Sequence, residues 1–236
     1  MIKAVLFDLD GTLLPMDMDA FAKTYFGGLA KWLVPHGFEP QQFIQSIWKG
    51  VVAMVKNTGG RTNESVFWDT FKDIYGEGVR ENEPYFDAYY RERFDEVQST
   101  CGVVEKAKEI IDKIKSKGVT VALATNPLFP AIATKKRIKW AGLDENDFAI
   151  VTTYENCTHS KPNLDYYRDV LSALNLKGEE CIMVGNDVDE DMVAETLGMK
   201  VFLITDCLLN KSGKDISVYP HGSFDELDKF LDENLQ

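Results

Sequence analysis

The second half of the chain alternates between short apolar runs and longer segments with apolar residues at helical spacing. The short runs, which are typical of buried strands, lie at 119–124, 148–153, 181–184 and 200–204. The longer segments predict helices at 103–117, 130–141, 163–174 and 189–197. Strands that alternate with helices pair in parallel through right-handed crossovers. We therefore expect an α/β fold with a doubly wound parallel sheet.

The first part of the chain departs from this rhythm. An apolar run at 2–7 predicts the first strand, but residues 15–98 then show helical spacing, as in Phe43, Ile47, Val51 and Val55. These residues also hold 16 of the 27 aromatic side chains. We expect an α/β core made of 1–14 and 99–236, with an all-helical domain at 15–98 inserted after the first strand. An insertion at this point is placed to act as a lid.

Composition narrows the classes of partner. The net charge of -12 and the pI near 4.8 disfavour nucleic acid and anionic membranes as partners. No apolar run approaches the ~18 residues of a membrane span, and four widely separated cysteines are typical of a reducing compartment. We expect a cytoplasmic protein. An anionic substrate would need a local positive feature to bind.

Two carboxylates end the first predicted strand. Asp8 and Asp10 follow the apolar run directly, and Gly11 permits a sharp turn after them. Asp-Gly is a common turn dipeptide, which accounts for Asp10 but leaves Asp8 unexplained. A carboxylate at the end of a buried strand is costly to desolvate unless it holds a cation or takes part in a reaction. The pair is therefore a candidate site.

Polar residues also follow the other predicted strands. Thr125 and Asn126 end the second strand, Lys161 lies in the loop after the third, and an acidic loop at 185–191 follows the fourth. In a parallel α/β sheet the carboxyl ends of the strands meet at the edge where ligands bind. We expect these residues to gather around Asp8.

This ordered set resembles the haloacid dehalogenase superfamily, specifically its phosphatase branch, and the resemblance covers the whole chain. The matching elements are Asp8-Leu9-Asp10-Gly11-Thr12, Thr125, Lys161 and the acidic loop from Gly185 to Asp191. The position of the helical insertion is similar to the superfamily's type 1 cap. The resemblance implies a Rossmann-type core with a helical cap, and the activity of a phosphatase.

The resemblance also implies roles. Asp8 would be the nucleophile that forms an aspartyl-phosphate, and Asp10 the general acid and base. Thr125 and Asn126 would bind the phosphoryl oxygens, and Lys161 would neutralise the charge that develops on them. Together they would hydrolyse a phosphomonoester.

A Mg²⁺ ion is the implied cofactor, held by Asp8, the backbone carbonyl of Asp10 and the acidic loop. The usual Gly-Asp start of that loop reads Gly185-Asn186-Asp187 here. We favour Asp187 as the metal ligand because an anionic oxygen binds Mg²⁺ better than an amide does, with Asn186 as the alternative. Asp191 would then orient Lys161 or a metal-bound water.

The sequence thus predicts a Mg²⁺-dependent phosphatase that acts on a small phosphorylated metabolite. A phosphomutase of the same superfamily is the main alternative, since it would use the same Asp8 and Asp10. A binding module without activity on the same fold is a more distant one, because each expected position carries a competent residue. A dehalogenase would need neither Asp10 nor a metal.

Overall fold

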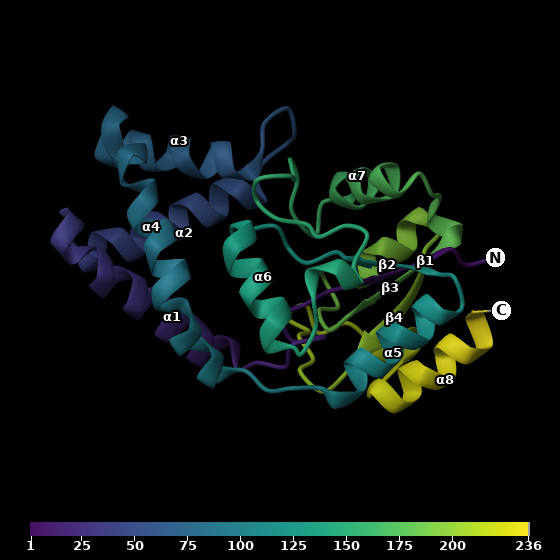
Figure 1. The fold of residues 1–236 in the computed structure, drawn as a ribbon. Coiled ribbons are helices and arrows are strands. Elements are labelled where there is room, and N and C mark those ends of the chain that lie inside the picture. Colours follow the sequence, from purple (N-terminus) through teal and green to yellow (C-terminus); the bar gives the residue numbers. More distant parts are fainter. Residues whose placement is uncertain (236) are drawn as a thin grey trace.

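The computed structural model describes residues 1–235 and contains a five-stranded parallel sheet with the strand order β2-β1-β3-β4-β5 (Figure 1). Phe7 at the end of β1 pairs with Leu123 of β2 and with Val184 of β3, so these three strands end level with one another. The predicted doubly wound α/β fold is confirmed. The strands are β1 (Ala4–Phe7), β2 (Thr120–Leu123), β3 (Cys181–Gly185), β4 (Lys200–Ile204) and β5 (His221–Gly222).

Helices cover both faces of the sheet because successive strand side chains point to opposite sides. Val5 and Phe7 belong to the hydrophobic cluster that includes Ile110 of α5 and Leu227 of α8. Leu6 lies instead in the cluster formed with Tyr166 of α7. Figure 1 shows α5 and α8 on one face and α7 on the other. The helices of this part are α5 (Glu105–Ser116), α6 (Ala131–Trp140), α7 (Leu164–Leu174) and α8 (Phe224–Asn234).

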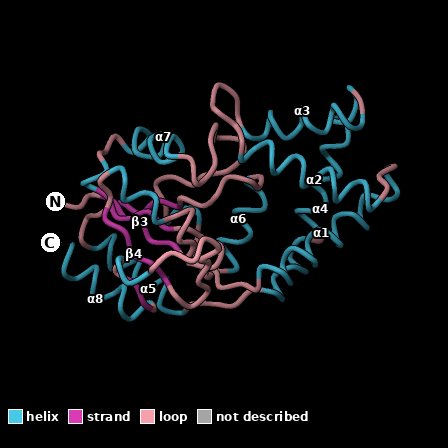
Figure 2. Tube along the Cα trace, turned by 180° about the vertical axis from the view of Figure 1, so that it is seen from behind, coloured by secondary structure: helices cyan, strands magenta, loops and turns pink. Residues whose placement is uncertain are grey.

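Residues 18–100 form a helical lobe at one end of the molecule, and Figure 2 shows it from behind. Side-chain caps start three of its helices: Asp17, Glu39 and Thr62 accept hydrogen bonds from backbone N–H groups of the first turns. The lobe contains α1 (Met18–Leu33), α2 (Pro40–Val55), α3 (Asn63–Tyr75) and α4 (Glu83–Glu92). Shorter 3₁₀ helices of the molecule lie at Val34–His36, Glu77–Asn82, Phe94–Thr100, Glu145–Asp147, Gly178–Glu180, Met192–Leu197 and Ile216–Val218.

A buried polar contact joins the lobe to the loops of the α/β part. Asn63, at the start of α3, is fully buried, and its Nδ2 donates to the carbonyl of Pro127 at 3.1 Å and to Ser160 Oγ at 3.0 Å. The Ser160 hydroxyl donates in turn to the carbonyl of Met54 in α2 at 3.2 Å. These loops carry Asn126 and Lys161, so the lobe is fixed against the segments that hold the expected site.

Two predicted elements were wrong in kind. Residues 148–153 form only an isolated bridge between Leu123 and Val151, because this segment pairs with β2 on one side and enters a turn at Thr153. Residues 189–197 form a 3₁₀ helix from Met192 instead of an α-helix from Asp189, since turns occupy the preceding residues. Across residues 1–235, no helix combines the length and the apolar character that crossing a bilayer requires.

Candidate active site

A buried lysine joins two carboxylates at the carboxyl edge of the sheet. Asp8 directly follows β1, Asp191 lies in the loop after β3, and Lys161 precedes α7. Lys161 Nζ lies 2.9 Å from Asp8 Oδ1 and 2.6 Å from Asp191 Oδ1. Lys161 and Asp191 are each 1 % exposed and Asp8 is 7 % exposed. The structure therefore brings together three of the residues that the sequence singled out.

Burial and neighbouring charges shift the pKa values of Lys161 and Asp191 in opposite directions. Burial alone would lower the pKa of Lys161, but the carboxylates of Asp191 and Asp8 raise it well above its ordinary value. Burial raises the pKa of Asp191, while the ammonium of Lys161 opposes that rise. Lys161 therefore carries a fixed positive charge at the end of β1.

The loop after β3 brings Asp191 to the lysine. The backbone N–H of Asp187 donates to Asp191 Oδ2 at 3.0 Å, which orients the carboxylate. Gly185 leaves the space that this arrangement needs, since a Cβ at that position would lie 2.1 Å from Asp191 Oδ2. A larger residue at position 185 would displace the partner of Lys161.

Two oxygen atoms converge on one hydroxyl beside Asp8. Thr12 Oγ1 lies 3.4 Å from Asp8 Oδ2 and 3.0 Å from Asn186 Oδ1. Asn186 Nδ2 donates to the carbonyl of Cys207 at 2.7 Å, so its amide oxygen faces Thr12. Gly11, with a φ of +85°, allows this close packing, because a Cβ there would lie 2.3 Å from Asn186 Nδ2. A single hydroxyl proton can satisfy one of the two oxygens, which leaves acceptor capacity for a cation.

Asp187 has a different environment. Its Oδ1 accepts hydrogen bonds from the backbone N–H groups of Asp189, at 2.8 Å, and of Glu190, at 3.0 Å. This carboxylate stabilises the turn of its own loop. The contacts of Asn186 therefore match those of a ligand next to Asp8 more closely, and the choice of Asp187 stays a prediction.

The donor set suits a hard cation. Among residues 1–235 there is no group of three or more His, Cys, Asp and Glu side chains arranged to hold a metal. A site here would combine the Asp8 carboxylate with amide or backbone oxygens. Mg²⁺ is bound by one or two carboxylates and keeps several waters, so this set fits it.

Asp10 is paired with an arginine that was not among the predicted site residues. Arg137 of α6 is fully buried, and its Nη1 donates to Asp10 Oδ2. Its guanidinium lies 4.2 Å from the ring centroid of Phe129. A sequence signal existed: Arg137 is four residues from both Ala133 and Ala141, which are buried on the apolar face of the helix. A charged residue at such a position needs a buried partner.

The second carboxylate oxygen of Asp10 does not take part in the pair with Arg137. Asp10 Oδ1 is buried and has no hydrogen-bond partner in the described part of the chain. Burial raises the pKa of Asp10 above its ordinary value, although the charge of Arg137 opposes the rise. One oxygen is thus held by Arg137, and the other is free to exchange a proton.

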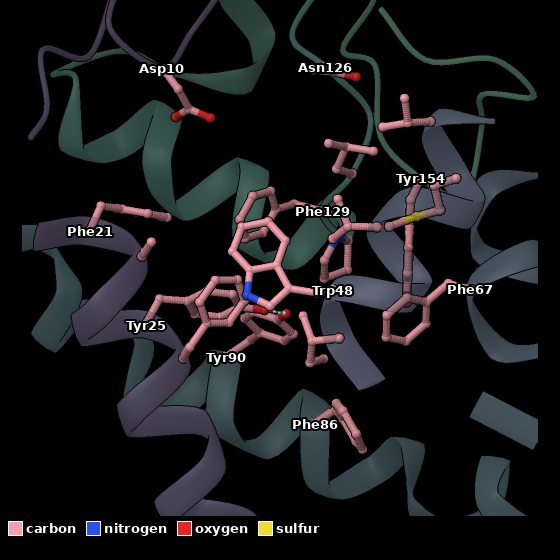
Figure 3. Close-up of a pocket in the computed structure, with 18 of the residues that line it drawn as sticks. Asp10, Phe21, Tyr25, Trp48, Phe67, Phe86, Tyr90, Asn126, Phe129 and Tyr154 are labelled. Atoms are coloured by element: carbon pink, nitrogen blue, oxygen red, sulfur yellow. Dashed lines mark hydrogen bonds between the residues drawn. The ribbon is translucent and has the colours of Figure 1, made fainter. Parts of the chain in front are cut away.

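The residues after β2 complete the edge. Thr125 is buried, and its carbonyl accepts hydrogen bonds from Thr152 Oγ1 at 2.7 Å and from the Tyr166 hydroxyl at 2.9 Å. Asn126 Nδ2 donates to Glu190 Oε2 at 2.8 Å, while Asn126 Oδ1 has no partner within residues 1–235. Asn126 and Asp10 both line a cavity of about 380 Å³ (Figure 3).

The site and the fold have counterparts in known proteins. A family model described as haloacid dehalogenase-like hydrolase matches residues 2–194, and the chain therefore belongs to this family of hydrolases. Ribulose-1,5-bisphosphate 5-phosphatase of Halopiger xanaduensis is 26 % identical over 219 residues, which cover 86 % of this chain and 84 % of that protein. Pyrophosphatase PpaX of Bacillus velezensis is 25 % identical over 199 residues, with 84 % and 81 % covered.

A solved structure supports the fold. The crystal structure of 2-haloacid dehalogenase from Pseudomonas syringae pv. Tomato superposes with a TM-score of 0.63 at 18 % identity, and 99 % of each chain is covered. At this identity the likeness concerns the fold alone.

Proposed function

We propose that this protein is a Mg²⁺-dependent phosphatase that hydrolyses a small phosphomonoester through an aspartyl-phosphate on Asp8. The observation that carries the proposal is the arrangement of Lys161 between Asp8 and Asp191, beside Asp10, which lines a cavity and has one carboxylate oxygen without a hydrogen-bond partner among residues 1–235. The phosphatase names of the two relatives support it.

In the first step a carboxylate oxygen of Asp8 attacks phosphorus, and the bond from phosphorus to the leaving oxygen breaks. Asp10 gives its proton to that oxygen, so the product leaves as a neutral alcohol. Lys161, 2.9 Å from Asp8 Oδ1, stabilises the negative charge shared by the phosphoryl oxygens and the carboxylate. Thr125 and Asn126 would orient the phosphoryl group.

In the second step water attacks the phosphorus of the aspartyl-phosphate. Asp10, now ionised, takes a proton from this water, and the bond from phosphorus to the Asp8 oxygen breaks. Inorganic phosphate and the free carboxylate result. Arg137 holds Asp10 in one orientation through both steps, and Asp191 does the same for Lys161.

Asp8, the backbone carbonyl of Asp10 and Asn186, with Asp187 as the alternative to Asn186, would hold Mg²⁺. The ion would supply positive charge that lets a phosphate dianion approach the carboxylates. The helical lobe, in the place of a type 1 cap, would cover the site and exclude bulk water.

The variant Asp8→Asn tests the nucleophile. We expect phosphate release from para-nitrophenyl phosphate in Mg²⁺ to fall by about 10⁴-fold or more, because the amide cannot form the intermediate. Asp73→Asn, an exposed position on α3, is the matched control and should retain wild-type activity. Turnover of Asp8→Asn near the wild-type rate would contradict the proposal. A radiolabelled phosphoryl group that stays on the wild-type protein for minutes in water would favour the phosphomutase.

A further inference from the structure

The cavity beside Asp10 extends into the helical lobe. Its volume of about 380 Å³ lies within the range of pockets that bury small ligands. Figure 3 shows Asp10 and Asn126 at one end of it and Phe86 of α4 at the other. Since Asp10 would protonate the leaving oxygen, the alcohol part of the substrate must occupy this space. The inference below rests on the proposed function for that orientation.

The walls of the cavity are mainly aromatic and aliphatic. Tyr25 and Tyr90 both line it, and their hydroxyl oxygens lie 2.6 Å apart, so each hydroxyl has a partner within the wall. Trp48 of α2 is 49 % exposed and lies 5.1 Å from Phe26, ring centroid to ring centroid, which gives the cavity an aromatic rim. Burial of apolar ligand surface against such walls contributes favourably to the free energy of binding.

The charged residues of the lining disfavour an anionic alcohol. Apart from Asp10, three carboxylates line the cavity, and the single lining cation in the described chain is Lys211, which is exposed. Arg137 is engaged by Asp10. A second phosphate or a carboxylate on the substrate would therefore meet carboxylates in an apolar setting.

The acidic residues of the lining do not favour a cationic alcohol either, because each already has an ion-pair or hydrogen-bond partner in the protein. Glu83 accepts from Arg80 Nε at 3.0 Å, Asp87 lies 3.7 Å from Arg91 Nη1, and Glu190 accepts from Asn126. The part of the lining that remains for a substrate to contact is therefore mainly apolar.

We infer that the substrate is the phosphate monoester of an uncharged, largely apolar alcohol with an aryl or alkyl body. This chemistry differs from that of the two relatives, whose names specify a bisphosphate and a pyrophosphate. The inference rests on the lining of the cavity in this protein, and not on the substrates of the relatives.

Binding of two phosphonates tests the inference without turnover. Benzylphosphonate and phosphonoacetate share the phosphonate group and differ in an apolar against an anionic body. With Mg²⁺ present, calorimetry on the wild-type protein should give a Kd for benzylphosphonate at least about tenfold lower than for phosphonoacetate. Equal affinities, or a preference for phosphonoacetate, would overturn the substrate class even if hydrolysis were established.

Two neighbouring positions on α2 provide matched variants. Val51 lines the cavity, whereas Val52 does not and is 48 % exposed. Val51→Lys should shift the ratio of the two dissociation constants by about tenfold toward phosphonoacetate, and Val52→Lys should leave it within about twofold. An unchanged ratio in Val51→Lys, with a wild-type circular dichroism spectrum, would show that the body of the ligand lies elsewhere and would overturn the inference.

Hydrolysis then separates this inference from the proposed function. Benzyl phosphate, glycerol 3-phosphate, phosphoglycolate, pyrophosphate and phosphocholine should be compared in Mg²⁺, with benzyl phosphate expected to have a kcat/KM at least about tenfold above the others. A preference for any of the other four compounds would overturn the substrate class while the phosphatase activity stands. No phosphate release from any of these compounds, with benzylphosphonate still preferred in binding, would remove the proposed function and leave the apolar specificity of the cavity.

Discussion

The charged edge of the sheet (Asp8, Asp10, Lys161, Asn186 and Asp191) and the cavity of the helical lobe differ in almost every physical respect. At the charged edge, buried ionic groups lie within hydrogen-bond distance of one another and are held by loops that follow strands. In the lobe, apolar side chains from several helices surround open space. Asp10 belongs to both regions. Under the proposed function, the charged edge would carry out the reaction and the cavity of the lobe would select the substrate.

The difference follows from what each region has to do. A charge that acts on a transferring phosphoryl group must be fixed in position and kept from water, which needs short contacts to rigid backbone. Recognition of an apolar body needs area and shape, which helices with large side chains supply. Loss of one partner should therefore have large effects at the charged edge and small effects in the lobe.

The largest effect is expected for Lys161→Met. It leaves the carboxylates of Asp8 and Asp191 buried without a cation, so we expect a loss of about 3–5 kcal/mol in the free energy of unfolding and a loss of activity of about 10³-fold or more. Denaturant unfolding measures the loss of stability, and phosphate release measures the loss of activity. Lys3→Met is the matched control: Lys3 pairs with Glu180 at 2.6 Å but is 56 % exposed, and its loss should cost about 1 kcal/mol or less. An equal loss in the free energy of unfolding for the two variants would contradict the expected difference between the buried ion pairs of the charged edge and an exposed ion pair.

An intermediate effect is expected for Arg137→Met at the border of the two regions. Arg137 pairs with Asp10, which belongs to the charged edge, and stacks on Phe129, which lines the cavity. Without it Asp10 is less well oriented, and kcat should fall by about 10- to 100-fold. Loss of a positive charge also raises the pKa of Asp10 further above its ordinary value.

The sign of the pH effect follows from the role of Asp10. In the proposed mechanism the first step requires the protonated carboxyl group, so activity should fall as the pH rises through the pKa of Asp10. Arg137→Met should therefore move the alkaline limb of the pH–rate profile to higher pH. Lys135→Met, which removes an exposed cation from the same helix, should leave the limb in place. A slower variant with an unshifted limb would assign Arg137 a purely structural role.

Much of the charged edge was predictable from the sequence because parallel strands end at one edge. Asp8, Lys161 and Asp191 each follow or flank a predicted strand, and the structure brings them into direct contact. The fold class followed from the same alternation of strands and helices. These predictions all depend on the order of strands and helices along the chain, which the spacing of apolar residues reveals.

The rest depends on how elements face one another, which periodicity does not encode. Arg137 lies in the middle of a helix that reads as basic, and its burial against Asp10 results from the rotation of α6. The strand expected at 148–153 has a pairing partner on one side, which its apolar run did not disclose. The aromatic residues of the lobe were visible, but the cavity among them depends on the packing of several helices.

The smallest effects are expected for variants of the two candidate metal ligands at the charged edge. Asn186 Oδ1 shares the Thr12 hydroxyl with Asp8, whereas Asp187 Oδ1 accepts from two backbone N–H groups of its own loop. Asn186→Ala should raise the Mg²⁺ concentration for half-maximal activity by about tenfold, because it removes an oxygen next to Asp8.

Asp187→Asn should raise the same Mg²⁺ requirement by about two- to threefold, since an amide oxygen can still accept both loop hydrogen bonds and the lost charge acts at longer range. Titration of phosphate release with Mg²⁺ at constant ionic strength measures both variants. Thermal unfolding without Mg²⁺ is the control, and it separates loss of the ligand from loss of the loop structure. A larger increase for Asp187→Asn than for Asn186→Ala, at equal stability, would restore Asp187 as the ligand, because an anionic oxygen would then outweigh proximity to Asp8 and Thr12.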